Sequence, residues 1–187
     1  MIKLCTFVAG LLVAATSVAQ PAAIDTQHST VTVHVYKTGL FSGLAHNHIV
    51  QAPIASGMVD PVQRTVVFSF NAADLKIADT EGSESEHKEI ESTMKGPTVL
   101  DVARFPAISF ASKRVEAASA QTYRVTGDLN LHGTTREITV PVTLSDGVYK
   151  GSVNLKQTDF GITPVKVAGG TVKVKDEVEI SFEIRAR

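Results

Sequence analysis

Alternation of apolar and polar residues along much of the chain predicts β-strands. Thr30–Tyr36 places a valine at every second position, with Thr32, His34 and Tyr36 on the opposite face. Such a period of two is typical of a strand that buries one side. The same pattern recurs at Val66, Phe68 and Phe70 of Thr65–Asn71, at Ile108 and Phe110, through Tyr123–Leu131, at Ile138, Val140, Val142 and Leu144, at Val153 and Leu155, at Val172 and Val174, and through Glu177–Arg185.

Turn signals separate most of these runs, including Asp60-Pro61, His132-Gly133, Asp146-Gly147 and Gly169-Gly170. About eight or nine strands with short connections are typical of an all-β antiparallel barrel or sandwich. A closed up-and-down barrel gives every strand one apolar and one polar face and leaves no sheet edge unpaired. We therefore expect an eight-stranded antiparallel barrel, a size that encloses either packed side chains or one small ligand.

One segment departs from the strand pattern and predicts a short helical insertion. Ser83 and Glu86 have the spacing of a capping box, with serine at the N-cap and glutamate at N3. The helix is expected over Glu84–Lys95, with Gly96 as a left-handed cap and Pro97 as the stop.

The expected helix has an apolar face that would meet the barrel. Ile90 and Met94 are four residues apart, and His87 lies three residues before Ile90 on the same face. Val99-Leu100 and Phe105-Pro106 follow as a return toward the barrel. The insertion is therefore expected to remain part of the same domain.

Residues 1–19 have the pattern of a secretory signal peptide. Lys3 is the only charge, an apolar run extends from Leu4 to Ala15, and small residues end the segment at Ala19. Cleavage is expected between Ala19 and Gln20, which leaves residues 20–187 as one exported domain. The less favoured interpretation is an uncleaved membrane anchor, for which the apolar run is short.

Composition narrows the classes of function. Of the 187 residues, 43% are hydrophobic and 20% are charged, as in ordinary globular proteins. The formal net charge of −1 argues against nucleic acid as a partner, because phosphate binding needs a basic surface. Cys5 is the only cysteine and lies in the expected signal peptide, so disulfides and cysteine-based metal sites are not expected.

Two neighbouring histidines supply the strongest candidate metal ligands. The run His46-Asn47-His48 can place two imidazoles on one side of an extended strand, and the candidate third ligand is His87 on the helix or one of Glu84, Glu86 and Glu89. Neutral imidazole binds zinc, copper, nickel and iron. The alternative is that His46 and His48 bond to loop backbone or line a cavity mouth, and two ligands are fewer than a zinc site normally has.

Catalytic motifs are absent from the sequence. It has no G-x-S-x-G, P-loop or G-x-G-x-x-G pattern, and no spacing of serine and histidine indicates a triad. The acidic residues between Asp79 and Glu91 are better explained by the helix N-terminus and a solvated helix face than by a cation site. We therefore expect a protein that is not an enzyme.

Two motifs resemble the YceI-like family of exported proteins. The segment Val99–Phe110 reads VLDVARFPAISF, and Val125–Arg136 reads VTGDLNLHGTTR. Ile24–Ser29 and Asp159–Ile162 are also similar to the family, so the resemblance extends over nearly all of residues 20–187.

The resemblance implies a lipocalin-like antiparallel barrel with a helical segment, and it implies that the exported domain is in the periplasm. It also implies binding of long polyisoprenoid chains, such as prenyl pyrophosphates or quinones, in an elongated apolar cavity. His132 would then serve turn geometry, and Arg104-Phe105-Pro106 would dock the helical segment. The chain departs from the family in its more acidic helix around Glu86–Ile90 and in His46-Asn47-His48. An acidic mouth would favour a neutral quinone over a pyrophosphate.

These inferences combine into a hypothesis of an isoprenoid-lipid binding protein without catalysis. Alternation and the family resemblance together predict a ligand-binding set of Phe41, Leu44, Phe68, Phe70, Ile90, Met94, Leu100, Phe110 and Phe160. The alternatives are a transition-metal-binding protein using His46, His48 and His87, and a small lipid-acting enzyme using the same histidines. Transient contact with a membrane or membrane protein, and dimerisation, are left open.

Overall fold

The structure is a computed structural model that describes residues 20–38, 47–167 and 170–187. The expected signal peptide and three predicted site residues, Phe41, Leu44 and His46, lie outside the described residues. No helix within the described ranges is long and apolar enough to span a membrane.

The described chain forms one antiparallel sheet and one α-helix. Two short 3₁₀ turns, η2 (Ala72–Asp74) and η3 (Gln157–Phe160), connect neighbouring elements, and the helix is α1 (Glu84–Lys95). The strands are β1 (Ala22–Ala23), β2 (Thr30–Thr38), β3 (His48–Gln51), β4 (Ile54–Asp60), β5 (Thr65–Asn71), β6 (Lys76–Ile77), β7 (Ala107–Ala117), β8 (Thr122–Leu131), β9 (Thr134–Ser145), β10 (Val148–Lys156), β11 (Lys166–Val167) and β12 (Val172–Arg185).

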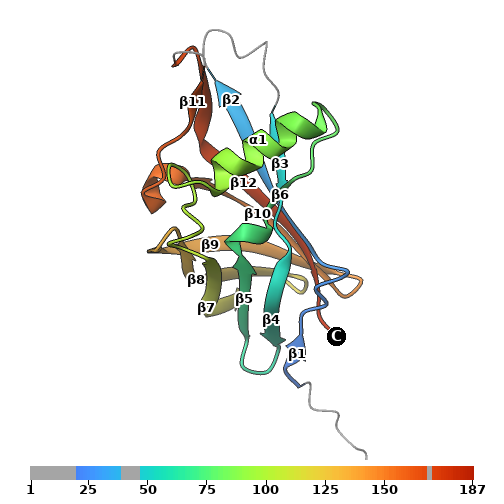
Figure 1. The fold of residues 1–187 in the computed structure, drawn as a ribbon. Coiled ribbons are helices and arrows are strands. Elements are labelled where there is room, and N and C mark those ends of the chain that lie inside the picture. The colour runs from blue at the N-terminus through green and yellow to red at the C-terminus, as the bar shows by residue number, and fades with distance from the viewer. Residues whose placement is uncertain (1–19, 39–46, 168–169) are drawn as a thin grey trace, which may run out of the picture.

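The sheet curls on itself because β3 and β4 belong to opposite ends of its strand order. That order is β1-β4-β5-β7-β8-β9-β10-β12-β2-β3-β6, with β11 beside β12. Only Ala52 and Pro53 separate β3 from β4 in the chain. The two ends of the hydrogen-bonded order are therefore brought together covalently, and the sheet forms a barrel-like shell (Figure 1).

The all-β antiparallel class is confirmed, whereas the predicted count of eight strands is wrong. The described residues form twelve strands, and the path of paired strands ends at β1 and β6 rather than closing as one unbroken ladder. Five strands have no counterpart among the predicted runs: the two-residue strands β1, β6 and β11, and the strands β3 and β4. Conversely, two predicted strands, the runs that begin at Val172 and at Glu177, are one strand in the structure. This strand is β12, and its pairing with β2 is irregular between Val174 and Val178.

Tight turns join the long neighbouring strands where the sequence predicts them. His132 and Gly133 have φ values of 52° and 70°, and Asp146 and Gly147 have values of 52° and 74°. Two successive positive φ values are the hallmark of the turn type that matches the twist of a two-residue hairpin. These turns set the registers Leu131↔Thr134 and Ser145↔Val148.

The predicted helix is present with its capping box. The Ser83 hydroxyl accepts from the Glu86 backbone N–H, and the Glu86 carboxylate accepts from the Ser83 N–H. The predicted left-handed cap is wrong, because Gly96 has φ −71° and ψ 172°. Pro97 accounts for this conformation, since the ring of a proline disfavours helical geometry in the residue before it.

Glycine in the middle of β8 permits a close approach of two strands. A Cβ on Gly127 would lie 2.5 Å from the Ala111 carbonyl oxygen and 2.6 Å from Cζ of Phe110. Gly127 pairs with Ser112, next to a register shift between Ser112 and Arg114. The absent side chain therefore lets the inward ring of Phe110 lie over β8.

We expect Gly127→Ala to lower the free energy of unfolding by about 3 kcal/mol, because the methyl group overpacks a backbone contact. Urea unfolding measures the change. Gly147→Ala is the control: its Cβ would meet nothing within 4 Å, and only its positive φ adds strain, about 1 kcal/mol. A Gly127→Ala protein as stable as wild type would show that the strands do not approach so closely.

Candidate functional site

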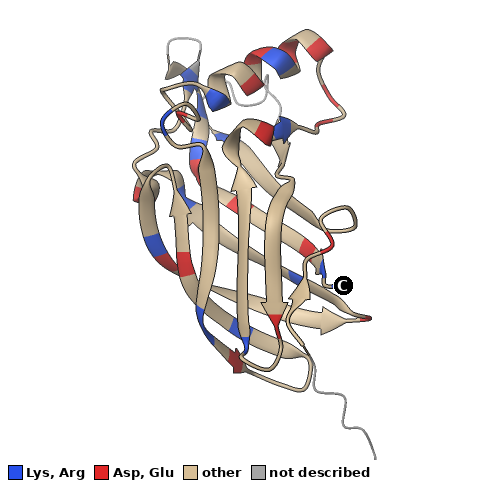
Figure 2. Ribbon diagram, turned by 60° about the horizontal axis from the view of Figure 1, so that its bottom comes forward, with Lys and Arg blue, Asp and Glu red and all other residues tan. Residues whose placement is uncertain are grey.

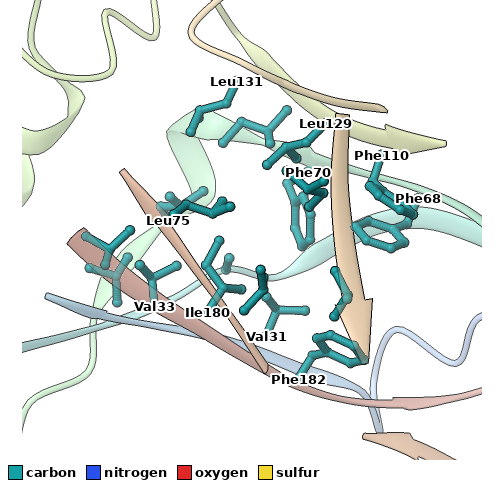
Figure 3. Close-up of a pocket in the computed structure, with 18 of the residues that line it drawn as sticks. Val31, Val33, Phe68, Phe70, Leu75, Phe110, Leu129, Leu131, Ile180 and Phe182 are labelled. Carbon is teal, nitrogen blue, oxygen red and sulfur yellow. The ribbon is translucent and has the colours of Figure 1, made fainter. Parts of the chain in front are cut away.

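The interior of the shell is a large apolar cavity. Its volume is about 860 Å³, within the range of sites that enclose a small molecule. The inward faces of the strands supply the wall, and Figure 3 shows aliphatic and aromatic side chains converging on it from opposite sides. The residues labelled there are Val31, Val33, Phe68, Phe70, Leu75, Phe110, Leu129, Leu131, Ile180 and Phe182.

Every predicted ligand-binding residue that the structure describes lies on this cavity. These residues are Phe68, Phe70, Ile90, Met94, Leu100, Phe110 and Phe160. Their position on the wall is a finding, and contact with a ligand remains a prediction.

Three of the phenylalanines form one aromatic cluster on β5 and β7. The Phe68 and Phe110 rings are stacked with centroids 5.1 Å apart, and Phe70 meets Phe68 edge-on at 5.5 Å. Register explains the cluster, because Phe68 pairs with Phe110 across the two strands. Offset and edge-on ring pairs are favourable arrangements, so this part of the wall holds its shape.

The sequence-based set omits much of the opposite wall. Inward residues of β8, β9 and β12, such as Leu129, Val140 and Ile180, line the cavity as well. Their alternation was visible in the sequence and identifies them as inward-facing. It could not distinguish a residue that lines open space from one that fills a solid core.

The helix and the turn after it cover one end of the cavity. Ile90, Met94 and Leu100 line the interior there, and the Leu100 N–H donates to the Met94 carbonyl oxygen at 3.0 Å. Figure 1 shows α1 lying across the end of the shell near β2 and β3. Leu100 is 8% exposed, whereas no residue of α1 itself is buried to that degree.

A carboxylate fixes this helix to the sheet edge. Glu91 Oε1 accepts from the Ile77 backbone N–H on β6 at 2.9 Å, and Lys95 Nζ lies 3.4 Å from Oε2. Partial burial of Glu91 raises its pKa, but these two donors outweigh burial, so the pKa lies below its usual range. Glu91 therefore stays charged and satisfies an otherwise unpaired edge N–H.

His48 and Asp79 form a hydrogen-bonded pair at the same end of the cavity. His48 is the first residue of β3, pairs with Val35 of β2 and lines the cavity. Its Nδ1 lies 2.6 Å from Oδ2 of Asp79, whose side chain is only 5% exposed. The other carboxylate oxygen, Oδ1, accepts the backbone N–H of Ile49. Both oxygens of Asp79 are therefore used to hold β3 and the imidazole of His48.

The two predicted histidine ligands that the structure describes, His48 and His87, each bond to another group of the protein. His87 Nε2 bonds to the Glu81 carbonyl oxygen at 2.7 Å, and His48 bonds to Asp79. Within the described ranges, no group of three or more histidine, cysteine, aspartate or glutamate side chains could hold a metal ion. The remaining predicted ligand, His46, lies outside those ranges.

The charges on the cavity lining differ from the expected acidic mouth. Among the helix glutamates, only Glu89 lines the cavity. The other charged lining residues in the described ranges are Lys37, Asp60, Arg64, Lys156 and Lys173. The acidic mouth is therefore a wrong expectation. Figure 2 shows both signs of charge along α1, and the lysines of the lining come from strands rather than from the helix.

The chain is similar to proteins of one family over almost its whole described length. The YceI-like domain matches residues 23–186. A UPF0312 protein of Pseudomonas syringae pv. syringae is 33% identical over 132 residues, which span 62% of this chain and 67% of the relative. A UPF0312 protein of Pseudomonas putida is 31% identical over 109 residues, spanning 53% of this chain and 55% of the relative.

Solved structures show the same fold. The Burkholderia cenocepacia protein BcnA aligns with a TM-score of 0.62 and 21% identity, covering 86% of this chain and 98% of BcnA. The Campylobacter jejuni YCEI protein aligns with a TM-score of 0.53 and 13% identity, covering 100% of this chain and 99% of that protein. At these identities the likeness concerns the fold alone.

We expect Glu91→Ala to loosen α1, because the Ile77 N–H loses its acceptor. Hydrogen exchange of residues 84–95 should accelerate about tenfold, equivalent to about 1.4 kcal/mol. Glu84→Ala is the matched control, since Glu84 also pairs with a lysine at i+4 but its side chain is 84% exposed. Equal exchange in the two variants would show that the Glu91 contact does not hold the helix.

Proposed function

The chain belongs to the YceI-like family, and we propose that it binds an isoprenoid-type lipid inside its shell and carries it without chemical change. The family is one of binding proteins, known for polyisoprenoid ligands, and is not a known enzyme family. The proposed ligand is a polyprenyl or quinone-type molecule whose hydrocarbon chain occupies the cavity.

The observation that carries this proposal is the apolar cavity itself. A volume of about 860 Å³ is bordered mostly by valine, leucine, isoleucine and phenylalanine side chains. A space of this kind has few partners for water and gains dispersion contacts when hydrocarbon fills it. Transfer of each methylene from water contributes about 0.8 kcal/mol before ordering costs. A long, flexible, apolar chain is therefore the class of molecule that the cavity favours.

The metal and enzyme alternatives have less support. The described residues hold no cluster suited to a metal. Catalysis on a lipid would need a reactive group beside His48, and the sequence contains no recognised nucleophile motif. Binding accounts for the cavity without a further group.

We propose also that the protein acts after export, in the periplasm. The pattern of residues 1–19 supports export. The expected intact mass of the periplasmic protein is that of a chain beginning at Gln20. Mass spectrometry of each fraction of the cells measures the intact mass of the chain. Recovery of the uncleaved chain in the membrane fraction would contradict this proposal.

We expect Val33→Trp to weaken the binding of a long prenyl alcohol by at least about tenfold, because the indole occupies space that the ligand needs. Val33 lines the cavity on β2. Titration calorimetry with geranylgeraniol gives the affinity, and thermal unfolding shows whether the fold is retained.

Thr32→Trp is the matched control, because Thr32 is the neighbouring residue of β2 and does not line the main cavity. It should bind as the unmodified protein does. If the two tryptophan variants bind equally well, the ligand does not occupy the interior of the shell.

A further inference from the structure

His48 is a polar side chain of the cavity wall whose position is fixed by a hydrogen bond to Asp79. The ladder of β2 with β3 places Val33 opposite Val50 and Val35 opposite His48. Because residues of one strand alternate faces, His48 shares the inner face with Val50. The imidazole therefore lies beside apolar wall residues, at the end of the cavity that α1 covers.

The segment carrying Asp79 is fixed to the same strand. Val50 pairs with Ile77, Gln51 with Lys76, and the Ala78 N–H donates to the Ile49 carbonyl oxygen at 2.8 Å. Asp79 follows immediately and bonds both to the Ile49 N–H and to His48. Asp79 cannot turn without losing its bond to the backbone of β3, and His48 cannot turn without losing its bond to Asp79, so the pair is preorganised.

The carboxylate also determines which nitrogen of His48 carries the proton. A carboxylate only accepts hydrogen bonds, so Nδ1 must be the donor to Asp79. In the neutral imidazole, Nε2 then has a free lone pair. The hydrogen bond that the His48 ring makes to the described residues uses Nδ1, and the side chain is 27% exposed, which leaves Nε2 accessible. The cavity end therefore offers a fixed acceptor to a group that donates.

We propose that His48, oriented by Asp79, accepts a hydrogen bond from a hydroxyl headgroup of the bound lipid. This inference rests on the proposed function and narrows it to lipids with an alcoholic or phenolic O–H. The hydrocarbon chain would extend from His48 along the apolar wall. A quinone carbonyl or an ether lacks the donor that this acceptor requires. A pyrophosphate would bring its negative charge close to Asp79.

A pair of probes that differ only in the donor tests the proposal. Geranylgeraniol and its methyl ether share one chain, but only the alcohol has an O–H. We expect the unmodified protein to prefer the alcohol about tenfold, equivalent to about 1.4 kcal/mol. His48→Leu should bind both probes equally, at the affinity of the ether. His34→Leu is the matched control and should keep the preference, because His34 lies on the neighbouring strand outside the cavity lining and bonds to Ser181.

Asp79→Asn separates headgroup recognition from a merely structural role. The single amide oxygen of asparagine would satisfy the Ile49 N–H, which leaves the amide NH₂ facing His48. Nδ1 would then accept, and the proton would move to Nε2. This variant should lose the preference for the alcohol, because Nε2–H donates to the oxygen of the alcohol and of the ether equally.

The ¹⁵N resonances of the His48 ring give a direct readout. In the unmodified protein, Nε2 should have the shift of an unprotonated nitrogen, and it should move when the alcohol binds but not when the ether binds. In Asp79→Asn, the two nitrogens should exchange protonation.

The outcomes distinguish the two levels of the account. Equal binding of alcohol and ether by the unmodified protein would overturn the role of His48 while leaving the cavity function intact. Binding of neither probe would overturn both. Preferential binding of geranylgeranyl pyrophosphate, lost in Lys37→Leu and kept in His48→Leu, would replace the hydroxyl headgroup with an anionic one and overturn the inference.

Discussion

The curl of the sheet is the constraint on which the rest of the structure depends. Because Ala52 and Pro53 link a strand at one end of the pairing order to a strand at the other, the sheet must enclose its inner face. All inward side chains then share one space. Those side chains leave about 860 Å³ open, and this apolar space is the physical basis of the proposed function. Alternation ensures that most of its border is hydrocarbon.

The same curl places the polar groups. An enclosed shell has ends where inner-face residues run out, and His48 stands where β3 begins. Segment 76–79 pairs with the edge of β3, which brings Asp79 to His48 and supplies the edge N–H that Glu91 accepts. One short strand, β6, thereby supports both the helix that covers the cavity and the imidazole at its end.

Sequence patterns predicted the elements whose two faces differ most. Glu177–Arg185 alternates without exception, and the capping box at Ser83 has its own local geometry. The strands β3 and β4 were missed, although Val50, Ala52 and Ile54 are buried at alternate positions. The alternation is hard to recognise because Ala52 is small and because Pro53 interrupts the run. Proline is unusual inside a strand. Because this signal is weak, the sequence did not show that the chain turns from β3 into β4, and the predicted strand count was too low.

The candidate site shows the same division. Alternation placed Phe68, Phe70 and Phe110 inward, because parity along one strand is a local property. The partner of His48 could not be predicted, since Asp79 is 31 residues away and reaches it only through the β3–β6 pairing. The charge of the cavity lining was also not predicted, because Lys37, Lys156 and Lys173 lie on strands that are distant in sequence from the acidic helix.

The most direct test is native mass spectrometry of the protein made in a bacterial periplasm and purified without detergent. The account predicts a mass above that of the polypeptide by an apolar molecule of several hundred daltons, which organic solvent extracts and whose identity its fragment spectrum gives. A bare polypeptide mass, unchanged after incubation with prenyl lipids, would contradict the claim that the shell encloses a lipid.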